Sequence, residues 1–284
     1  MARASHRHHS LMAAALIPFI LWIGAFLLLP AIRIVMSSFQ VEDGQGFTLG
    51  HFERAFRSPV FSIGMVNSIK ISLFSSVIGI VAGWIGAYSF SRFSPRVRDT
   101  LLNLSNIMTN FAGVPLAFSL IVLFGTSGML TVLLNKLGWP WLALDLYSWN
   151  GLLLAYIYFQ IPLAVLLLYP ALYGIKEEWK EAACLVGASG LQFWRHIGIP
   201  VLLPSAIGTL NILFANAMGA YATAYALLTS SATLLPIQIA GLVSGDIFPR
   251  YELGSALAVI LTLFMVLPML VNQWMLKLVR RRLR

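Results

Sequence analysis

Six apolar stretches, each long enough to cross a lipid bilayer, constrain this chain more than any other feature of its sequence. A transmembrane helix needs about 20 consecutive, mostly apolar residues. The stretches cover approximately residues 11–37, 62–90, 101–124, 150–173, 201–229 and 254–278. They predict an all-α, polytopic membrane protein with six transmembrane helices.

The overall composition supports a membrane protein. The 284 residues are 59% hydrophobic and 10% charged, whereas about a quarter of the residues in a soluble domain are charged. A single water-soluble core could not bury this much apolar surface. The net charge of +9 is spread beside the ends of the stretches, which favours lipid headgroups over nucleic acid as the partner. The first stretch is too long for a signal peptide and lacks a small-residue cleavage site, so we interpret it as a retained anchor.

The basic residues also predict an orientation. Thirteen of the nineteen Lys and Arg residues lie on the side that holds both termini, segment 91–100 and segment 174–200, and four lie in the opposite loops. Six of the ten acidic residues lie on that opposite side. Because Lys and Arg accumulate in cytoplasmic loops, we expect both termini and segment 174–200 to be cytoplasmic.

Segment 175–200 has the pattern of a short helical hairpin. Apolar residues recur at i, i+3, i+4 and i+7 in its first half, at Trp179, Ala182, Ala183 and Val186. Gly187 would end this helix, and Ser189 with Gln192 forms the S-x-x-Q pattern of a capping box for a second helix. Small residues on the surface would let another protein approach closely. Physical reasoning leaves two interpretations open, a docking site for a protein and an amphipathic loop resting on the membrane.

The same segment resembles a family motif. The pattern E-A-A-x₃-G-x₉-I-x-L-P is matched by Glu181, Ala182, Ala183, Gly187, Ile197 and Pro200. The sequence departs from it only at Ile199, an aliphatic exchange. It therefore resembles the EAA loop of permease subunits of ATP-binding-cassette importers, most closely those of the polyamine, phosphonate and ferric-iron branch. The resemblance extends over roughly residues 62–276.

The resemblance implies a location in the cell (inner) membrane, a set of partners and a mechanism. It implies that residues 175–200 are a coupling loop, which sits in a cleft of a cytoplasmic ATPase dimer and carries its movement into the membrane. Glu181 would make polar contacts with the ATPase, Ala182 and Ala183 would allow close packing, and Gly187 would set the turn. A second permease, expected to be a different chain, would complete the path, and an extracytoplasmic binding protein would deliver the solute.

The domain organisation and chemistry follow from the same interpretation. Residues 1–61 would form a tail, the first helix and an outer loop, residues 62–276 the permease core, and residues 277–284 a basic tail. The sequence lacks the G-x-x-x-x-G-K-[ST] phosphate loop, so ATP hydrolysis is expected on the separate ATPase and this chain is not expected to be an enzyme. We expect no cofactor, and no metal site, since three of the five histidines lie in the N-terminal tail.

Polar residues inside the stretches are candidates for the translocation path. They are Asn103, Asn106, Asn110, Gln160, Asn216 and Tyr221, with Tyr156, Asn211, Thr223 and Tyr225 as further polar positions. The alternative is hydrogen bonding between helices, for which Asn, Gln and Thr are commonly used. The resemblance implies a small solute, such as a polyamine or a phosphonate.

Two other functions compete with the importer. A stand-alone channel or secondary transporter would work without an ATPase, but ion coupling requires ionisable residues inside the membrane, which are nearly absent here. A membrane scaffold or sensor would not require the fixed spacing of the 181–200 motif.

Overall fold

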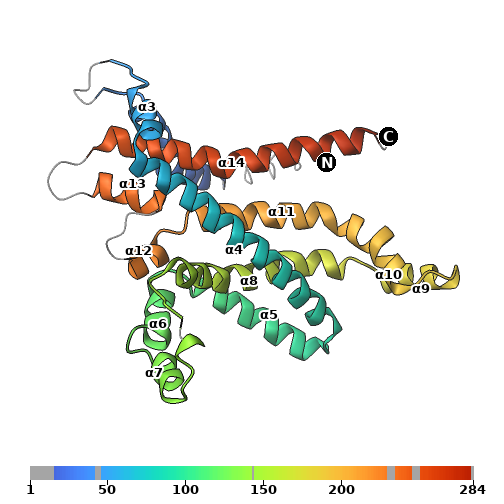
Figure 1. Ribbon diagram of the computed structural model, residues 1–284. Helices are drawn as coiled ribbons and strands as arrows, with labels where there is room; N and C mark the ends of the chain where they lie inside the picture. The colour runs from blue at the N-terminus through green and yellow to red at the C-terminus, as the bar shows by residue number, and fades with distance from the viewer. Residues whose placement is uncertain (1–15, 42–45, 143, 229–233, 245–249, 283–284) are drawn as a thin grey trace. The chain divides into compact units, whose positions relative to one another are not determined.

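The structure is a computed structural model that describes residues 16–41, 46–142, 144–228, 234–244 and 250–282. These residues are almost entirely helical (Figure 1). Six helical stretches are long and apolar enough to cross a membrane: Leu16–Ser37, Pro59–Arg92, Val114–Lys136, Trp149–Tyr173, Gly190–Met218 and Tyr251–Trp274. The prediction of an all-α protein with six transmembrane helices is therefore confirmed.

The helices follow one another with short connections. In chain order they are η1 (Gly24–Leu28), α2 (Leu29–Ser37), α3 (Gly50–Arg57), α4 (Pro59–Arg92), α5 (Pro95–Asn110), α6 (Val114–Phe124), α7 (Met129–Lys136), η2 (Pro140–Leu142), α8 (Trp149–Tyr173), α9 (Glu177–Leu185), α10 (Gly190–Phe193), η3 (Trp194–Gly198), α11 (Ile199–Met218), α12 (Ala222–Leu228), α13 (Leu235–Val243) and α14 (Tyr251–Arg282). By contacts they form two compact units, Met1–Ser62 with Ile239–Ile260 and Ile63–Gln238 with Leu261–Arg284.

Two of the expected spans are interrupted. The prediction of one helix over residues 101–124 is wrong, because α5 ends at Asn110 and α6 begins at Val114. Gly113 between them has φ of +82°, a left-handed backbone conformation that residues other than glycine rarely adopt. Pro115 has no backbone N–H to donate to a preceding turn of helix. The span expected over residues 201–229 also stops early, at Met218, and resumes as α12. Residues 11–15 and 229 lie outside the described ranges.

In the larger unit, α4 packs closely against α8 through small residues. A Cβ atom on Gly79 would lie 2.9 Å from the Cβ of Gln160, and one on Gly83 would collide with Ala164. Ser72, Ser75 and Ser76 of α4 are also buried. Small residues allow membrane helices to approach each other closely, which increases van der Waals contact where lipid provides no hydrophobic drive.

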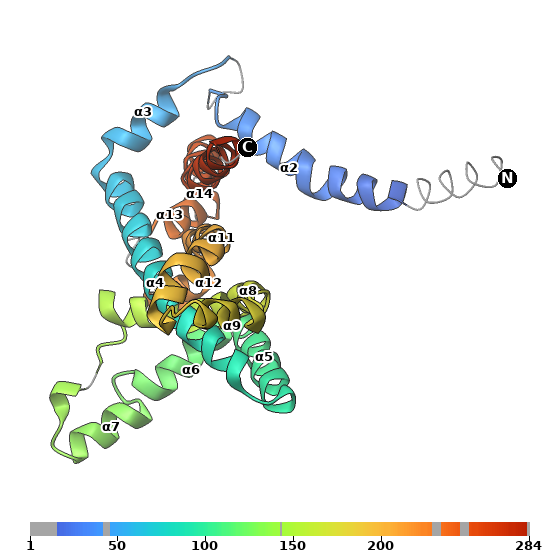
Figure 2. The ribbon, with the colours of Figure 1, turned by 90° about the vertical axis from the view of Figure 1, so that its right-hand side faces the viewer.

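Two apolar clusters hold the helices of this unit together. The first is centred on Leu116 and Leu120 of α6, Leu152 and Tyr156 of α8, and Leu227 of α12. The second joins Ala87 of α4, Val165 and Leu168 of α8, and Leu202 of α11. The helices α6 and α7 extend away from α5 and α8 (Figures 1 and 2).

The smaller unit contains the first span and the amphipathic helix α3. None of the first span's apolar window is buried within this chain, so its surface is available to lipid or to another subunit. At α3, a ring nitrogen of His51 lies 2.9 Å from the carbonyl of Gln40, and Arg57 pairs with Glu53 at 2.8 Å.

Candidate functional site

The hairpin that follows α8 is built around a tight glycine turn. The N–H of Gly187 donates to the carbonyl of Cys184 and the N–H of Ala188 donates to that of Ala183, both at 3.0 Å. This pair of bonds is the Schellman motif, which requires a left-handed residue after the helix. Gly187 meets that requirement with φ of +83°. The predicted end of the first helix is therefore confirmed, within a residue or two.

The second half of the hairpin begins with the predicted capping box. The N–H of Gln192 donates to Ser189 Oγ at 3.3 Å, and the N–H of Ser189 donates to Gln192 Oε1 at 2.7 Å. These bonds satisfy amide groups that a helix end would otherwise leave without partners. From Ser189 the chain runs through α10 and η3 into α11, so the hairpin is continuous with a membrane-crossing helix (Figure 1).

The tip of the hairpin exposes large apolar side chains. Leu185, Val186 and Leu191 are 89%, 84% and 81% exposed. Between the two halves lies a hollow of about 720 Å³, lined by Trp179, Ala182, Val186, Phe193 and Ile197 among others. Exposed apolar surface beside a hollow is typical of a protein-binding site.

The motif residues take different positions around this hollow. Glu181, Ala182 and Gly187 are exposed, and Ile197 is half-buried in the lining. Ala183 is buried, so its small side chain also serves the internal packing of the hairpin. Pro200 lies in the first turn of α11. Among the ion pairs of the described residues, Lys180 pairs with Glu177 at 3.3 Å and none involves Glu181.

An aromatic contact connects the hairpin to α4. The rings of Trp194 and Tyr88 meet edge to face, with centroids 5.5 Å apart. Trp194 also packs over Gly198, where a Cβ atom would collide with the indole. The base of the hairpin is therefore fixed to α4 as well as to α11.

Gln160 of α8 forms a buried polar centre among three helices. Its Nε2 donates to the Leu213 carbonyl of α11 at 2.7 Å and to Ser76 Oγ of α4 at 3.2 Å. Asn216 Nδ2 lies 3.5 Å from Gln160 Oε1. The structure thus brings together Gln160 and Asn216, two of the candidate path residues. Both take part in hydrogen bonds between helices, which is the alternative to a role in the translocation path. The sequence alone does not single out Ser76, although serines and glycines recur along α4 at small-residue spacing.

The interruption between α5 and α6 is hydrogen-bonded to the helix that follows the interruption between α11 and α12. The N–H of Gly113, between α5 and α6, donates to Thr223 Oγ1 of α12 at 2.9 Å. The hydroxyl of Tyr156 donates to the carbonyl of Ala220, between α11 and α12, at 2.7 Å. Tyr221 and Tyr225 stack nearby, with ring centroids 5.2 Å apart. Backbone polar groups freed by broken membrane helices need such partners.

The asparagine face of α5 lies on the surface of this chain. Asn103, Asn106 and Asn110 are exposed, and Asn110 Nδ2 donates to the Asn106 carbonyl at 2.8 Å. In the described part of the chain, no hydrogen bond joins these asparagines to Gln160. Among the described residues, no group of three or more His, Cys, Asp and Glu side chains comes together as a metal site would require.

Comparisons with known proteins agree with this architecture. Residues 76–284 match the family model described as "Binding-protein-dependent transport system inner membrane component". The chain is 24% identical over 246 residues to the spermidine/putrescine transport system permease protein PotC of Haemophilus influenzae, covering 85% of this chain and 90% of that protein. It is 27% identical over 266 residues to the trehalose transport system permease protein SugB of Mycobacterium tuberculosis, covering 91% and 88%.

Solved structures share the fold. A chain of a bacterial ABC transporter that imports the acidic polysaccharide alginate superposes with a TM-score of 0.73 at 18% identity, covering 96% of both chains. A chain of the MetNI methionine ABC transporter in an inward-facing conformation gives 0.58 at 16% identity, covering 82% of this chain and 99% of that one. The family match spans most of the chain, and the chain therefore belongs to the inner-membrane permease components of binding-protein-dependent ATP-binding-cassette importers.

Proposed function

We propose that this permease forms a translocation path with a second, different permease chain. A separate ATPase dimer binds residues 181–200 and drives transport. The observation that carries the proposal is the exposed hairpin tip. Leu185, Val186 and Leu191 are almost fully exposed, and they lie within a motif that has the family's spacing. A water-exposed apolar tip is unfavourable unless a partner covers it.

The hairpin has the stiffness that coupling requires. Its turn and its second helix start are both hydrogen-bonded, and Trp194 fixes its base to Tyr88. An ATPase can shift the permease between two conformations only by binding one of them more tightly. A shift from 1:99 to 99:1 needs a difference of about 5.5 kcal/mol, which a rigid element can transmit and a loose loop cannot.

The proposed path passes the interrupted helices. Many transporters bind solutes where membrane helices are discontinuous, because backbone groups and polar side chains become accessible there. The exposed Asn106 and Asn110 precede the first interruption, and Tyr221 lies in the second. These residues, with Asn103, are the proposed solute or partner-permease contacts, while Gln160 and Asn216 support the helices behind them.

Two solute classes are proposed for testing. Polyamines come first, because PotC is named for spermidine and putrescine, and disaccharides second, because SugB is named for trehalose. Among the six candidate spans, the only acidic residue is Glu252, in the first turn of α14. A polycation would therefore find amides and aromatic rings along the path instead of carboxylates.

The test compares charge reversal at two glutamates of α9. Glu181→Arg is expected to reduce copurification of a candidate ATPase at least about tenfold. The new arginine would face the basic partner group proposed for Glu181, and like charges at an interface are strongly unfavourable. Glu178→Arg, also exposed on α9 but outside the motif, is the matched control. ATP-driven uptake into vesicles should fall with the first variant only. Equal uptake by both variants, or uptake without any ATPase, would favour the channel or secondary-transporter alternative.

A further inference from the structure

A second cavity lies at the base of the hairpin, where α4 and α8 end. Its volume is about 600 Å³, and its polar lining includes Tyr88, Arg92, Lys176, Glu177, Lys180 and Trp194. It is separate from the hollow between the hairpin halves, although Phe193 contributes to both. The proposed coupling to an ATPase does not assign it a role.

The cavity carries an excess of positive charge. Three cationic side chains and one carboxylate line it, and that carboxylate, Glu177, is already paired with Lys180 at 3.3 Å. Arg92 Nη2 donates to the Tyr88 hydroxyl at 2.9 Å, and its guanidinium lies 5.2 Å from the centroid of that ring. These contacts orient Arg92 without neutralising it. In the described part of the chain, neither Arg92 nor Lys176 pairs with a carboxylate.

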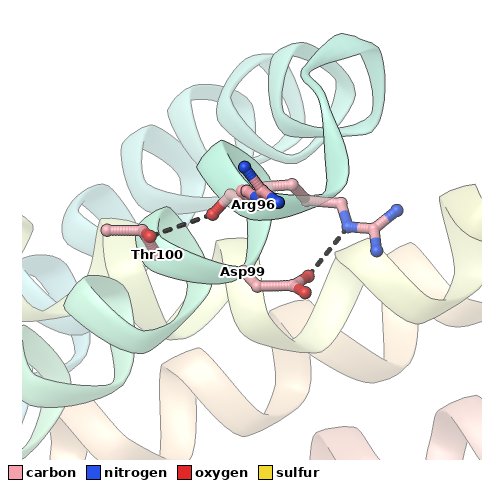
Figure 3. Close-up of polar contacts among 4 residues, drawn as sticks. Arg96, Asp99 and Thr100 are labelled. Atoms are coloured by element: carbon pink, nitrogen blue, oxygen red, sulfur yellow. Dashed lines mark hydrogen bonds and ion pairs between the residues drawn. The ribbon is translucent and has the colours of Figure 1, made fainter.

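The neighbouring arginine of α5 is occupied in a different way. Arg98 Nε donates to Asp99 Oδ1 at 3.1 Å, and Figure 3 draws this contact as a dashed line to the labelled Asp99. The hydrogen bond to this carboxylate raises the pKa of Arg98. Its guanidinium also stands 5.8 Å from the ring centroid of Tyr173. Among the cationic side chains that line the cavity, the charge without a carboxylate partner is therefore on Arg92 and Lys176.

The cavity lies at the ends of two candidate membrane spans, where the headgroup of a lipid would be. Both α4 and α8 are long enough to span a membrane, and they end at Arg92 and Tyr173. The amphipathic rings of Tyr88, Tyr173 and Trp194 line the cavity, and such rings gather at membrane–water interfaces. Basic cavities between transmembrane helices at this level suit the phosphate of an acidic lipid.

An apolar face of α4 leads from the cavity along the membrane-spanning helix. Val81, Ile85, Tyr88 and Arg92 recur at i, i+4, i+7 and i+11, which places them on one side of the helix. Val81 and Ile85 are 57% and 64% exposed. An acyl chain could lie along these two side chains while its headgroup meets Arg92. A free phosphate ion would gain nothing from this face.

We propose that this cavity binds the phosphate headgroup of an anionic phospholipid, whose acyl chain lies on the Val81–Ile85 face of α4. The lipid would bridge Arg92 of α4 and Lys176 at the start of α9, and would thereby hold the base of the hairpin. Lipid binding requires no ATPase or solute, so the inference can fail or hold independently of the proposed transport function.

The experiment measures lipid retention by the full-length permease complex. Wild-type and variant complexes are exchanged into nanodiscs with equal parts of phosphatidylcholine and phosphatidylglycerol, and the lipids that remain bound are identified by native mass spectrometry. Arg92→Gln and Lys176→Gln are each expected to lower phosphatidylglycerol retention about fivefold, the effect of one basic residue near an acidic surface. Arg96→Gln, an exposed arginine of α5 outside the cavity lining, should retain wild-type levels.

Further variants separate the lipid from other anions and from misfolding. Arg92→Lys should restore most retention, and Ile85→Asn should lower it without changing the charge. Thermal midpoints of all variants identify any that fail to fold. Undiminished retention in the folded Arg92→Gln, Lys176→Gln double variant would overturn the proposal. Displacement of the lipid by inorganic phosphate alone, with no effect of Ile85→Asn, would overturn it in favour of a free-anion site.

Discussion

At the scale of a single residue, Gly187 determines the shape of the hairpin. Its φ of +83° is strained for any residue with a Cβ atom, yet a Cβ there would meet nothing within 4 Å. The cost of substitution therefore comes from the backbone alone, about 1–2 kcal/mol for a left-handed residue. Gly187→Val should reduce ATP-driven uptake more than Gly187→Asn, because asparagine tolerates this conformation.

Gly190 provides the matched control for this prediction. It too has nothing within 4 Å of a built Cβ, but its φ lies outside the left-handed range. Gly190→Ala should therefore leave uptake and the thermal midpoint unchanged. If Gly187→Val and Gly190→Ala behaved alike in both measurements, the turn would not depend on the left-handed backbone.

At the scale of the element, Gln160 links α4, α8 and α11. Gln160→Leu removes its bonds to Ser76 and the Leu213 carbonyl, and bonds between membrane helices contribute about 0.6 kcal/mol each on average. We expect a loss of about 1 kcal/mol or more in unfolding free energy, because polar partners are left buried. Denaturation in detergent micelles measures it. Asn103→Leu, an amide-to-leucine change on the exposed face of α5, should leave stability unchanged.

The hydrogen bond between Gly113 and Thr223 joins the two helix interruptions, and its contribution to stability can be tested. Thr223→Val keeps the shape of a buried side chain but removes the hydroxyl that accepts from the Gly113 N–H. An amide left without this partner costs about 1–3 kcal/mol. We expect a lower thermal midpoint, and Thr223→Ser, which keeps the hydroxyl, should recover most of it. A Thr223→Val variant as stable as wild type would mean that the junction does not depend on this bond.

Features that depend on near neighbours in the chain were predictable from the sequence, whereas contacts between distant helices were not. The hairpin was predictable, because Gly187, Ser189 and Gln192 act on neighbours a few residues away. The interruption at Gly113 was not, because membrane helices tolerate Gly and Pro inside apolar runs when neighbouring helices satisfy the backbone. Its partner Thr223 lies 110 residues further along the chain, and Ser76 lies 84 residues from Gln160. Periodicity carries no information about such pairs.

At the scale of the whole molecule, the orientation in the membrane is still a prediction, and the chain contains its own probe. Cys184 is its only cysteine and is exposed in the hairpin. If segment 174–200 is cytoplasmic, as the distribution of Lys and Arg predicts, a membrane-impermeant maleimide should not label intact cells. It should label Cys184 in inside-out vesicles, and bound ATPase should slow that reaction because the hairpin tip is then covered.

A cysteine on the opposite side makes this test symmetrical. In a Cys184→Ser background, Glu53→Cys on the exposed surface of α3 should react with the same reagent in intact cells and not in sealed inside-out vesicles. Three of the six candidate spans, an odd number, lie between α3 and the hairpin, so the two probes should give opposite results. Labelling of Cys184 from outside the cell would place the hairpin away from ATP, and the proposed coupling would then be physically impossible.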